Sequence, residues 1–280
     1  MDIFQNIYQK STELFQRFDG EKRIIGKSGL GRNLYAVKIG DGSPVGIAVY
    51  AIHGREFITA ELAFLHAALG IKTGSVWILP LINPDGALLS EIGLDSVENP
   101  QIQAWLSRFS AEELRQWKAD AFGVDLNVNF DADWGKGIKN ARERGAANGI
   151  GDYPFSETET RALRDFTEEI SPDYTVSYHA KGEEIYWRYF QSGARLARDK
   201  RIAEKLSAAT GYPLKETKGS VGGYKDWCIK RKKIPAFTVE VGDDAFLHPL
   251  TRTALLNIVE HNLYALGALA DAVAAEMREK

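Results

Sequence analysis

The sequence predicts a single α/β domain, built on a mostly parallel or mixed twisted sheet with helices on both faces. Short apolar, β-branched runs alternate along the chain with amphipathic helical patterns. Several of the runs are almost entirely apolar, as in strands that are buried on both faces. The 280 residues, 44% of them hydrophobic, are enough for one large domain or at most two small ones. No internal repeat or composition shift marks a domain boundary.

The composition excludes several classes of function. The formal net charge is −3, from 35 Lys+Arg and 38 Asp+Glu, so no basic excess favours nucleic-acid binding. No stretch reaches the roughly 18 to 20 apolar residues of a membrane span. Residues 1–8 lack the features of a signal peptide, and we expect a cytoplasmic protein. The one cysteine, Cys228, excludes an internal disulfide and a zinc site built from cysteines.

The first elements are predicted from apolar spacing. Residues 2–18 carry apolar side chains at helical spacing, which predicts an amphipathic helix. Two strands are expected at 24–28 and 33–39, joined by a glycine-rich turn. The apolar run 46–52 predicts a buried central strand, and a helical pattern over 57–69 follows it almost directly.

The middle of the chain combines one clear strand with polar connections. The apolar run 75–82 predicts a buried strand, and 83–86 (NPDG) has the chemistry of a turn. Residues 87–121 carry many charges and predict surface-facing helices. A short strand is expected at 121–130, before a polar loop over 131–153. A loop of that length inside a compact domain is usually functional.

The last part of the chain returns to alternating strands and helices. Ser156 is expected to cap a helix, with Glu159 as its capping-box partner. The remaining predicted elements are strands at 174–179 and 233–242 and helices at 191–209 and 249–276.

Three of the predicted strands end in, or run into, polar residues that suit one catalytic site. His53 and Glu56 follow the central strand, His179 ends another, and Glu240 lies in an otherwise apolar strand. Ligands in open α/β sheets bind at the carboxyl ends of strands. Two histidines and a glutamate form a zinc set that leaves a fourth position for water.

Each residue also has a plainer interpretation. His53 could be a core histidine, and Glu56 a glutamate favoured by a helix N-terminus. Glu240 is harder to explain as a structural residue, because a buried unpaired carboxylate is costly. A glutamate that is not a ligand can act as general base on water activated by zinc, and can pass the proton to the leaving amine. The set therefore favours hydrolysis of a peptide or amide bond.

Five short blocks, in order, resemble the zinc carboxypeptidase superfamily of M14-type metallopeptidases, over roughly residues 20–275. The blocks are 53–56 (HGRE), 83–86 (NPDG), 123–130 (GVDLNVNF), 177–179 (SYH) and 237–240 (FTVE). The resemblance implies a mixed sheet of about eight strands between helices, and one Zn²⁺ per chain. It divides the chain into an N-terminal helix packed on the domain (1–20) and a zinc peptidase domain (21–280).

The resemblance also implies roles for single residues. The implied zinc ligands are His53, Glu56 and His179, and the implied general base is Glu240. Arg55 matches a family arginine that assists substrate binding. Asn127 matches an asparagine that binds the terminal carboxylate of the substrate.

Other positions depart from the family pattern. Val128 replaces the arginine that grips the C-terminal carboxylate with Asn127; a guanidinium binds a carboxylate bidentately and valine cannot. Lys118 matches the arginine that polarises the scissile carbonyl. Lys218 occupies the place of a mobile tyrosine, with Tyr224 near but offset, and we count Tyr224 among the substrate-binding candidates. Lys225 falls in the pocket for the leaving side chain, where a cation favours an acidic residue.

These departures fit a bacterial branch that resembles γ-D-glutamyl-meso-diaminopimelate peptidases. The stretches that look like this branch are 117–119 (WKA), 182–187 (GEEIYW) and 222–227 (GGYKDW). Diaminopimelate carries a second carboxylate at the far end of its side chain. Lys225, together with Arg188 or Arg144, is expected to hold that carboxylate. The expected partner is a small peptide, in particular one derived from the cell wall.

Two other functions stay open from the sequence. The same zinc site would serve a carboxypeptidase on ordinary peptides or a deacylase of N-acyl amino acids. Loss of the arginine at Val128 is less compatible with strict recognition of a C-terminal carboxylate. A chain of this fold can also be a catalytically silent binding protein, which need not hold a metal.

Overall fold

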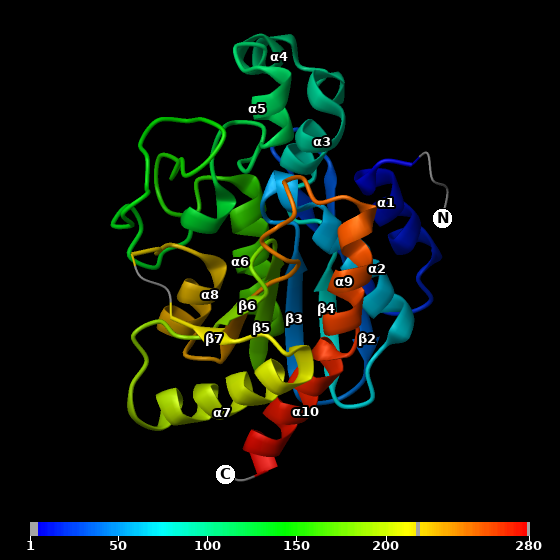
Figure 1. The fold of residues 1–280 in the computed structure, drawn as a ribbon, viewed down its shortest axis with the longest axis vertical. Coiled ribbons are helices and arrows are strands. Elements are labelled where there is room, and N and C mark those ends of the chain that lie inside the picture. The colour runs from blue at the N-terminus through cyan, green and yellow to red at the C-terminus, as the bar shows by residue number, and fades with distance from the viewer. Residues whose placement is uncertain (1–4, 217–218, 279–280) are drawn as a thin grey trace.

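The computed structural model describes residues 5–216 and 219–278 and contains one eight-stranded mixed sheet, as the sequence predicts (Figure 1). The strands are β1 (Lys22–Lys27), β2 (Asn33–Gly40), β3 (Val45–Tyr50), β4 (Ser75–Leu79), β5 (Tyr174–His179), β6 (Glu184–Tyr186), β7 (Leu214–Lys215) and β8 (Ala236–Glu240). Their order across the sheet is β1-β2-β4-β3-β5-β8-β6-β7. The four central strands, β4, β3, β5 and β8, are mutually parallel, so their carboxyl ends meet at one edge.

Helices cover both faces of the sheet, as expected (Figure 1). The α-helices are α1 (Ile7–Arg17), α2 (Ile58–Leu69), α3 (Pro84–Ile92), α4 (Pro100–Leu106), α5 (Ala111–Arg115), α6 (Thr158–Ile170), α7 (Gly193–Thr210), α8 (Tyr224–Trp227), α9 (Arg252–Asn262) and α10 (Ala265–Arg278). Helices α2, α7, α9 and α10 pack on one face, and α6 and α8 pack on the other.

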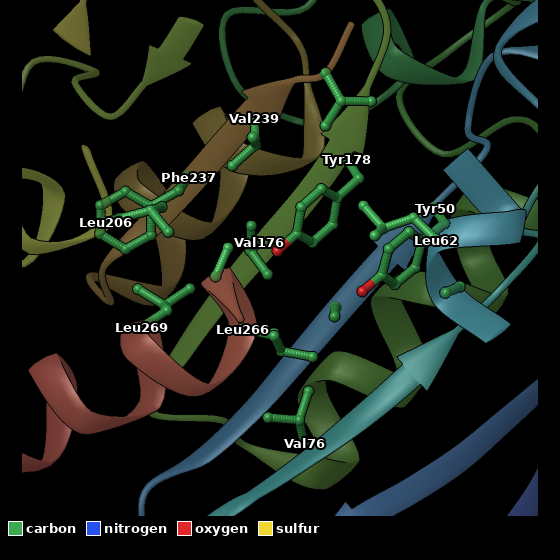
Figure 2. Close-up of a cluster of buried hydrophobic side chains, with 14 of the residues drawn as sticks. Tyr50, Leu62, Val76, Val176, Tyr178, Leu206, Phe237, Val239, Leu266 and Leu269 are labelled. Atoms are coloured by element: carbon green, nitrogen blue, oxygen red, sulfur yellow. The ribbon is translucent and has the colours of Figure 1, made fainter. Parts of the chain in front are cut away.

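Alternate residues of each central strand supply the two hydrophobic layers. Tyr50 of β3 and Tyr178 of β5 stack on the α2 side with ring centroids 4.7 Å apart (Figure 2). Val49, the residue before Tyr50 in β3, packs on the α6 side. Because the side chains of a strand alternate between faces, the apolar runs of the sequence bury residues on both sides. This packing fixes the register of the parallel strands.

The register brings the predicted site residues to the same edge. Tyr50 of β3 lies opposite Tyr178 of β5, so the residues that follow Tyr50 lie beside the end of β5. His179 of β5 lies opposite Glu240 of β8. Helices α3, α4 and α5 and the long loop over 131–153 lie at this end of the molecule (Figure 1).

Several predicted elements were wrong. Residues 121–130 form no strand; they contain a short 3₁₀ helix, η3 (Leu126–Val128), whose start is fixed by the Asp125 carboxylate accepting from the Asn127 N–H. The turn predicted at 83–86 is the start of α3, with the Asn83 side chain as its N-cap. Helix α3 is largely buried rather than surface-facing. The predicted helix 249–276 is two helices, α9 and α10.

The capping box predicted at Ser156 and Glu159 was also wrong. Helix α6 begins one residue later, with Glu157 as N-cap residue. The Ser156 hydroxyl donates to the Glu157 carboxylate, and Glu159 accepts from the Gly29 N–H of the β1–β2 turn. The Ser156 hydroxyl also accepts from the Asn129 side chain. Each of the two side chains thus has a partner that is distant in the sequence, which the local pattern does not specify.

The N-terminal helix α1 packs against the body of the protein through Ile7, which clusters with Phe64 of α2 and with Leu81. Within the described ranges, no helix combines the length and the apolar character that a bilayer crossing requires.

Candidate metal centre and active site

The candidate metal ligands stand where strands end. After β3, the chain passes through His53 into a 3₁₀ turn, η1 (Gly54–Glu56), which places Glu56 at the start of α2. A Cβ atom at Gly54 would lie 2.4 Å from the Gly86 carbonyl oxygen, so only glycine allows η1 to pack this closely on α3. His179 is the last residue of β5. Strand ends therefore position both histidines, and a tight turn positions the glutamate.

The three side chains converge on one point. His53 Nδ1 lies 2.8 Å from Glu56 Oε1, and His179 Nδ1 lies 3.0 Å from Glu56 Oε2. The two Nδ1 atoms are 3.1 Å apart, and the ligand atoms of all three residues lie within 4.8 Å of one another. All three side chains are buried. Two imidazole nitrogens and a carboxylate that face each other in this way leave lone pairs directed at a common cation.

The electrostatics of the cluster suit a divalent metal. Burial alone would raise the pKa of Glu56, but the adjacent His53 and His179 hold that pKa well below its ordinary value. The carboxylate is therefore ionised, as a metal ligand must be. Nitrogen and oxygen donors in a set of three match a zinc site that keeps one position open. The residues thus fit the Zn²⁺ that the sequence leads us to expect.

Asp125 is a site residue that the sequence prediction missed. Its buried carboxylate lies between two site residues: Oδ1 is 3.3 Å from His53 Nε2, and Oδ2 is 3.0 Å from Lys118 Nζ. Burial opposes its charge, but Lys118 and His53 keep the pKa of Asp125 far below its ordinary value. A carboxylate behind a metal-binding histidine orients the ring. The only signal in the sequence was its place in the block 123–130, two residues before Asn127.

Glu240 ends β8 beside His179. Burial raises the pKa of Glu240 to about 7, against the opposing charge of His179. The nearby Glu56 carboxylate contributes to this rise. A carboxylate with a pKa near the working pH is suited to accept and then release a proton.

Glu240 lines a cavity of about 190 Å³ together with Asn127 and Lys225. Inside it, Lys225 Nζ lies 2.6 Å from Asp226 Oδ1, and both residues are more than nine-tenths buried. The Asn127 side-chain oxygen accepts from the Tyr224 backbone N–H at 3.1 Å. Asn127 and Lys225 thus lie beside Glu240, as the sequence led us to expect, but Lys225 has a counter-charge that the sequence analysis did not foresee.

Three other cations were named from the sequence, and the structure describes two of them, each with a counter-charge. Lys118 lies at the site but is tied to Asp125. Burial would lower the pKa of Lys118, and the Asp125 charge reverses this and raises it. Arg188 pairs with Glu216 at a distance of 2.6 Å on an exposed surface. Lys218 lies outside the residues that the structure describes.

Tyr224 does not reach the site with its phenol. Its side chain is fully buried on the α6 side of the sheet, and its hydroxyl is 2.8 Å from the Thr167 hydroxyl of α6. The phenol therefore cannot contact a substrate in this arrangement, and the expectation that Tyr224 binds substrate was wrong. The neighbouring residue on α8, Lys225, faces the cavity instead.

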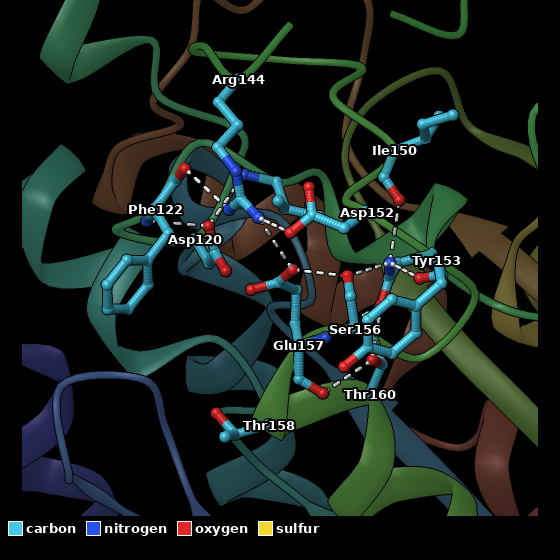
Figure 3. A network of polar contacts seen from close by, with 12 residues as sticks. Asp120, Phe122, Arg144, Ile150, Asp152, Tyr153, Ser156, Glu157, Thr158 and Thr160 are labelled. Atoms are coloured by element: carbon cyan, nitrogen blue, oxygen red, sulfur yellow. Dashed lines mark hydrogen bonds and ion pairs between the residues drawn. The ribbon is translucent and has the colours of Figure 1, made fainter. Parts of the chain in front are cut away.

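Arg144 belongs to a separate polar network rather than to the cavity beside Glu240 (Figure 3). Its guanidinium lies 3.0 Å from Asp152 and 3.8 Å from Glu157. The expectation that Arg144 holds a substrate carboxylate in the pocket of Lys225 was therefore wrong.

The same network anchors the loop that supports Asp125. The Asp125 backbone N–H donates to the Gly149 carbonyl at 2.8 Å, and the Lys118 N–H donates to Ala146. The Asn129 side chain donates to the Ile150 carbonyl and to the Ser156 hydroxyl, which fixes the far end of the loop. The long polar loop is in this way held against the segments that carry Lys118 and Asp125.

The fold has close neighbours among solved structures. Bovine thrombin-activatable fibrinolysis inhibitor superposes with a TM-score of 0.76 and 20% identity, over 97% of this chain and 98% of the other. Murein-tripeptide amidase MpaA from Escherichia coli O157 superposes with a TM-score of 0.61 and 23% identity, over 90% and 92% of the two chains.

Sequence comparison gives the family. One relative is gamma-D-glutamyl-L-diamino acid endopeptidase 1 from Lysinibacillus sphaericus, 28% identical over 78% of this chain and 59% of its own length. Murein peptide amidase A from Escherichia coli K12 is 31% identical over 65% of each chain. The chain thus spans about three fifths to two thirds of the length of these curated relatives. Residues 20–265 match the Peptidase M14 family, zinc carboxypeptidase, and the chain belongs to this family.

Proposed function

We propose that this protein is a zinc-dependent peptidase that hydrolyses the γ-D-glutamyl bond to meso-diaminopimelate in peptides derived from peptidoglycan. The observation that carries the hydrolytic part is the convergence of His53, Glu56 and His179 within 4.8 Å, next to Glu240. The names of two relatives, an endopeptidase for γ-D-glutamyl-L-diamino acid bonds and a murein peptide amidase, support the substrate class.

The chemistry follows from the positions of the chain's own residues. Zinc held by the three ligands would activate water and polarise the scissile carbonyl. Glu240 is placed to take a proton from the water and to deliver it to the leaving nitrogen, because its pKa of about 7 permits both steps near neutral pH. Lys118, held in place by Asp125, supplies a fixed positive charge near the carbonyl oxygen.

The cavity beside Glu240 supports diaminopimelate as the leaving residue. The far end of meso-diaminopimelate carries both a carboxylate and an ammonium group. Lys225 offers a cation and Asp226 an anion, 2.6 Å apart and both buried. The carboxylate of a zwitterionic group can pair with Lys225 while its ammonium group pairs with Asp226. The side chain of lysine or glutamate as leaving residue can pair with only one of the two. An unmatched buried charge is costly, so the pair favours the zwitterion.

A second candidate is a carboxypeptidase on ordinary peptides, or a deacylase of N-acyl amino acids. Asn127 lines the cavity, where it can meet a terminal carboxylate. Val128 follows it in η3 without a cationic side chain, which speaks against strict C-terminal recognition. A catalytically silent binding protein is a third candidate. The presence of the three candidate metal ligands together with Glu240 argues against it.

One experiment separates these functions. Zinc-loaded protein is given L-Ala-γ-D-Glu-meso-diaminopimelate, the same peptide with L-lysine in the last position, and a hippuryl-type peptide; Glu240→Gln serves as control. We expect release of diaminopimelate by the wild type, loss of that release in the control, and one zinc per chain in both. Cleavage of only the hippuryl peptide would support the carboxypeptidase. No cleavage of any peptide by zinc-bound protein would support an unrelated amide substrate or the silent binder.

A further inference from the structure

A second wall of the site carries cations and lies apart from the cavity of Lys225. The Arg55 backbone N–H donates to the Trp117 carbonyl at 2.7 Å. The neighbouring Gln116 side chain donates to the His248 carbonyl at 2.6 Å. Three segments that are distant in the sequence are thereby joined into one surface beside the metal ligands. Neither Arg55 nor His248 lines the cavity that contains Lys225.

Arg55 is the unusual member of this wall. Within residues 5–216 and 219–278, its guanidinium forms no ion pair, and its Nε atom is buried without a hydrogen-bond partner. Lys118, by contrast, is paired with Asp125. The His248 Nδ1 atom is also buried and without a partner. Buried polar groups are nearly always hydrogen-bonded, so two orphaned atoms on one wall point to a missing partner.

The charges around the wall define that partner. Burial lowers the pKa of His248 to about 4; the charges of Arg55 and Lys181 contribute to this shift, and the carboxylate of Glu56 opposes it. The imidazole is therefore neutral at pH 7 and can act as an uncharged donor next to the Arg55 guanidinium. A guanidinium with an adjacent neutral donor matches a carboxylate.

The proposed substrate has a carboxylate in the corresponding place. A γ-glutamyl amide is cleaved at the side-chain carbonyl, so the α-carboxylate of glutamate stays free on the acyl side of the bond. Two methylenes and the α-carbon separate it from the reacting carbonyl. In an α-linked peptide the α-carboxyl group is itself part of the bond, so a residue without an acidic side chain has no carboxylate there. The leaving residue is assigned to the cavity with Lys225, which leaves the wall with Arg55 for the acyl side.

We infer that Arg55, with His248 beside it, binds the free α-carboxylate of the γ-linked glutamate and so favours a γ-glutamyl bond over an α-linked bond of a residue without an acidic side chain. This inference rests on the proposed function. It explains the selectivity for the type of bond that is cleaved and not the selectivity for the leaving residue. It assigns the selectivity for the bond to Arg55 and the selectivity for diaminopimelate to Lys225, which lines a separate cavity.

The test changes the substrate and the enzyme together. L-Ala-γ-D-Glu-meso-diaminopimelate is compared with the peptide whose glutamate α-carboxylate is a carboxamide, using the wild type, Arg55→Met and Arg55→Lys. A hydrogen bond to a charged group is worth about a 10- to 100-fold change. We expect amidation to lower kcat/KM of the wild type by about that factor. Arg55→Met should show the same loss on the carboxylate peptide and no further loss on amidation, and Arg55→Lys should recover part of it.

Zinc content and far-UV circular dichroism are measured on each variant, so that a damaged metal centre is recognised independently of activity. If Arg55→Met loses zinc, the comparison of the two peptides is read from Arg55→Lys and from His248→Gln, which should both reduce the discrimination. Equal cleavage of both peptides by the wild type, or an equal loss on both in the Arg55 variants, would overturn the inference and leave the proposed function intact. Failure of the zinc-bound wild type to cleave either peptide would overturn the proposed function and the inference with it.

Discussion

Asp125 gives the sharpest test of how the metal centre is built. Its carboxylate contacts one of the three metal ligands, His53, and one further cation, Lys118. Asp125→Asn keeps the shape of the side chain and removes its charge. Loss of such an outer partner typically lowers metal affinity 10- to 100-fold. The distance of 3.3 Å to His53 Nε2 is longer than a strong hydrogen bond, so we expect about 10- to 30-fold, or about 1.4 to 2 kcal/mol.

The assay is competition for zinc against a chelator of known affinity, at fixed pH and ionic strength. Two variants separate the contributions. Lys118→Met removes the other partner of Asp125 and should leave zinc affinity within about twofold, because Lys118 does not contact a ligand. Asp120→Asn is the matched control: Asp120 is also fully buried and lies five residues earlier, but its carboxylate accepts from the Phe122 and Val124 N–H groups instead. Zinc binding by Asp125→Asn that equals the wild type would refute the role of Asp125.

Three further predictions concern single side chains. Lys225→Met should lower the preference for diaminopimelate over lysine in the last position by about 10- to 100-fold in kcat/KM, because a charged hydrogen bond is lost; an unchanged preference would remove Lys225 from substrate recognition. Tyr224→Phe should keep kcat/KM within about twofold and lower the free energy of unfolding by about 1 kcal/mol, since the hydrogen bond to Thr167 is lost; a large loss of activity would support a catalytic role for the phenol. Burial lowers the pKa of His66 from 6.5 to about 4, so the unfolded chain takes up the proton first as the pH falls. The stabilisation that depends on neutral His66 is therefore complete above about pH 6.5 and is lost as the pH falls towards 4. Between pH 7 and pH 5, the free energy of unfolding in urea should fall by about 2 kcal/mol more in the wild type than in His66→Gln. An equal fall in the two proteins would contradict a neutral buried His66.

The parts of the site that could be predicted from the sequence are those fixed by strand ends. His53, His179 and Glu240 each follow or end an apolar run that forms a strand in the structure. Once those strands are parallel neighbours, their carboxyl ends coincide and the polar residues must meet. The sequence pattern therefore predicts that these three residues lie close together, although it predicts no distance between them.

The residues that could not be placed depend on short or irregular segments. Asp125 precedes a single 3₁₀ turn whose position is set by contacts with Gly149, far along the chain. Tyr224 and Lys225 are neighbours on a helix of only four residues, and one side chain enters the core while the other faces the cavity. A count along the sequence cannot decide such a difference. Strands β6 and β7 are too short to show any periodicity.

The charges of the site differ in whether the free protein already satisfies them. Lys225 has its partner Asp226 within 2.6 Å, so a ligand there must replace an existing interaction. The buried Nε atom of Arg55 has no partner in the described part of the chain, so an anion there supplies an interaction that the free protein lacks. A buried polar group without a hydrogen-bond partner lowers the stability of the free protein, and destabilising groups of this kind are concentrated at functional sites. An anionic substrate group therefore gains the most binding free energy at the wall of Arg55. A leaving residue that cannot replace both charges of the pair of Lys225 and Asp226 loses the most binding free energy there.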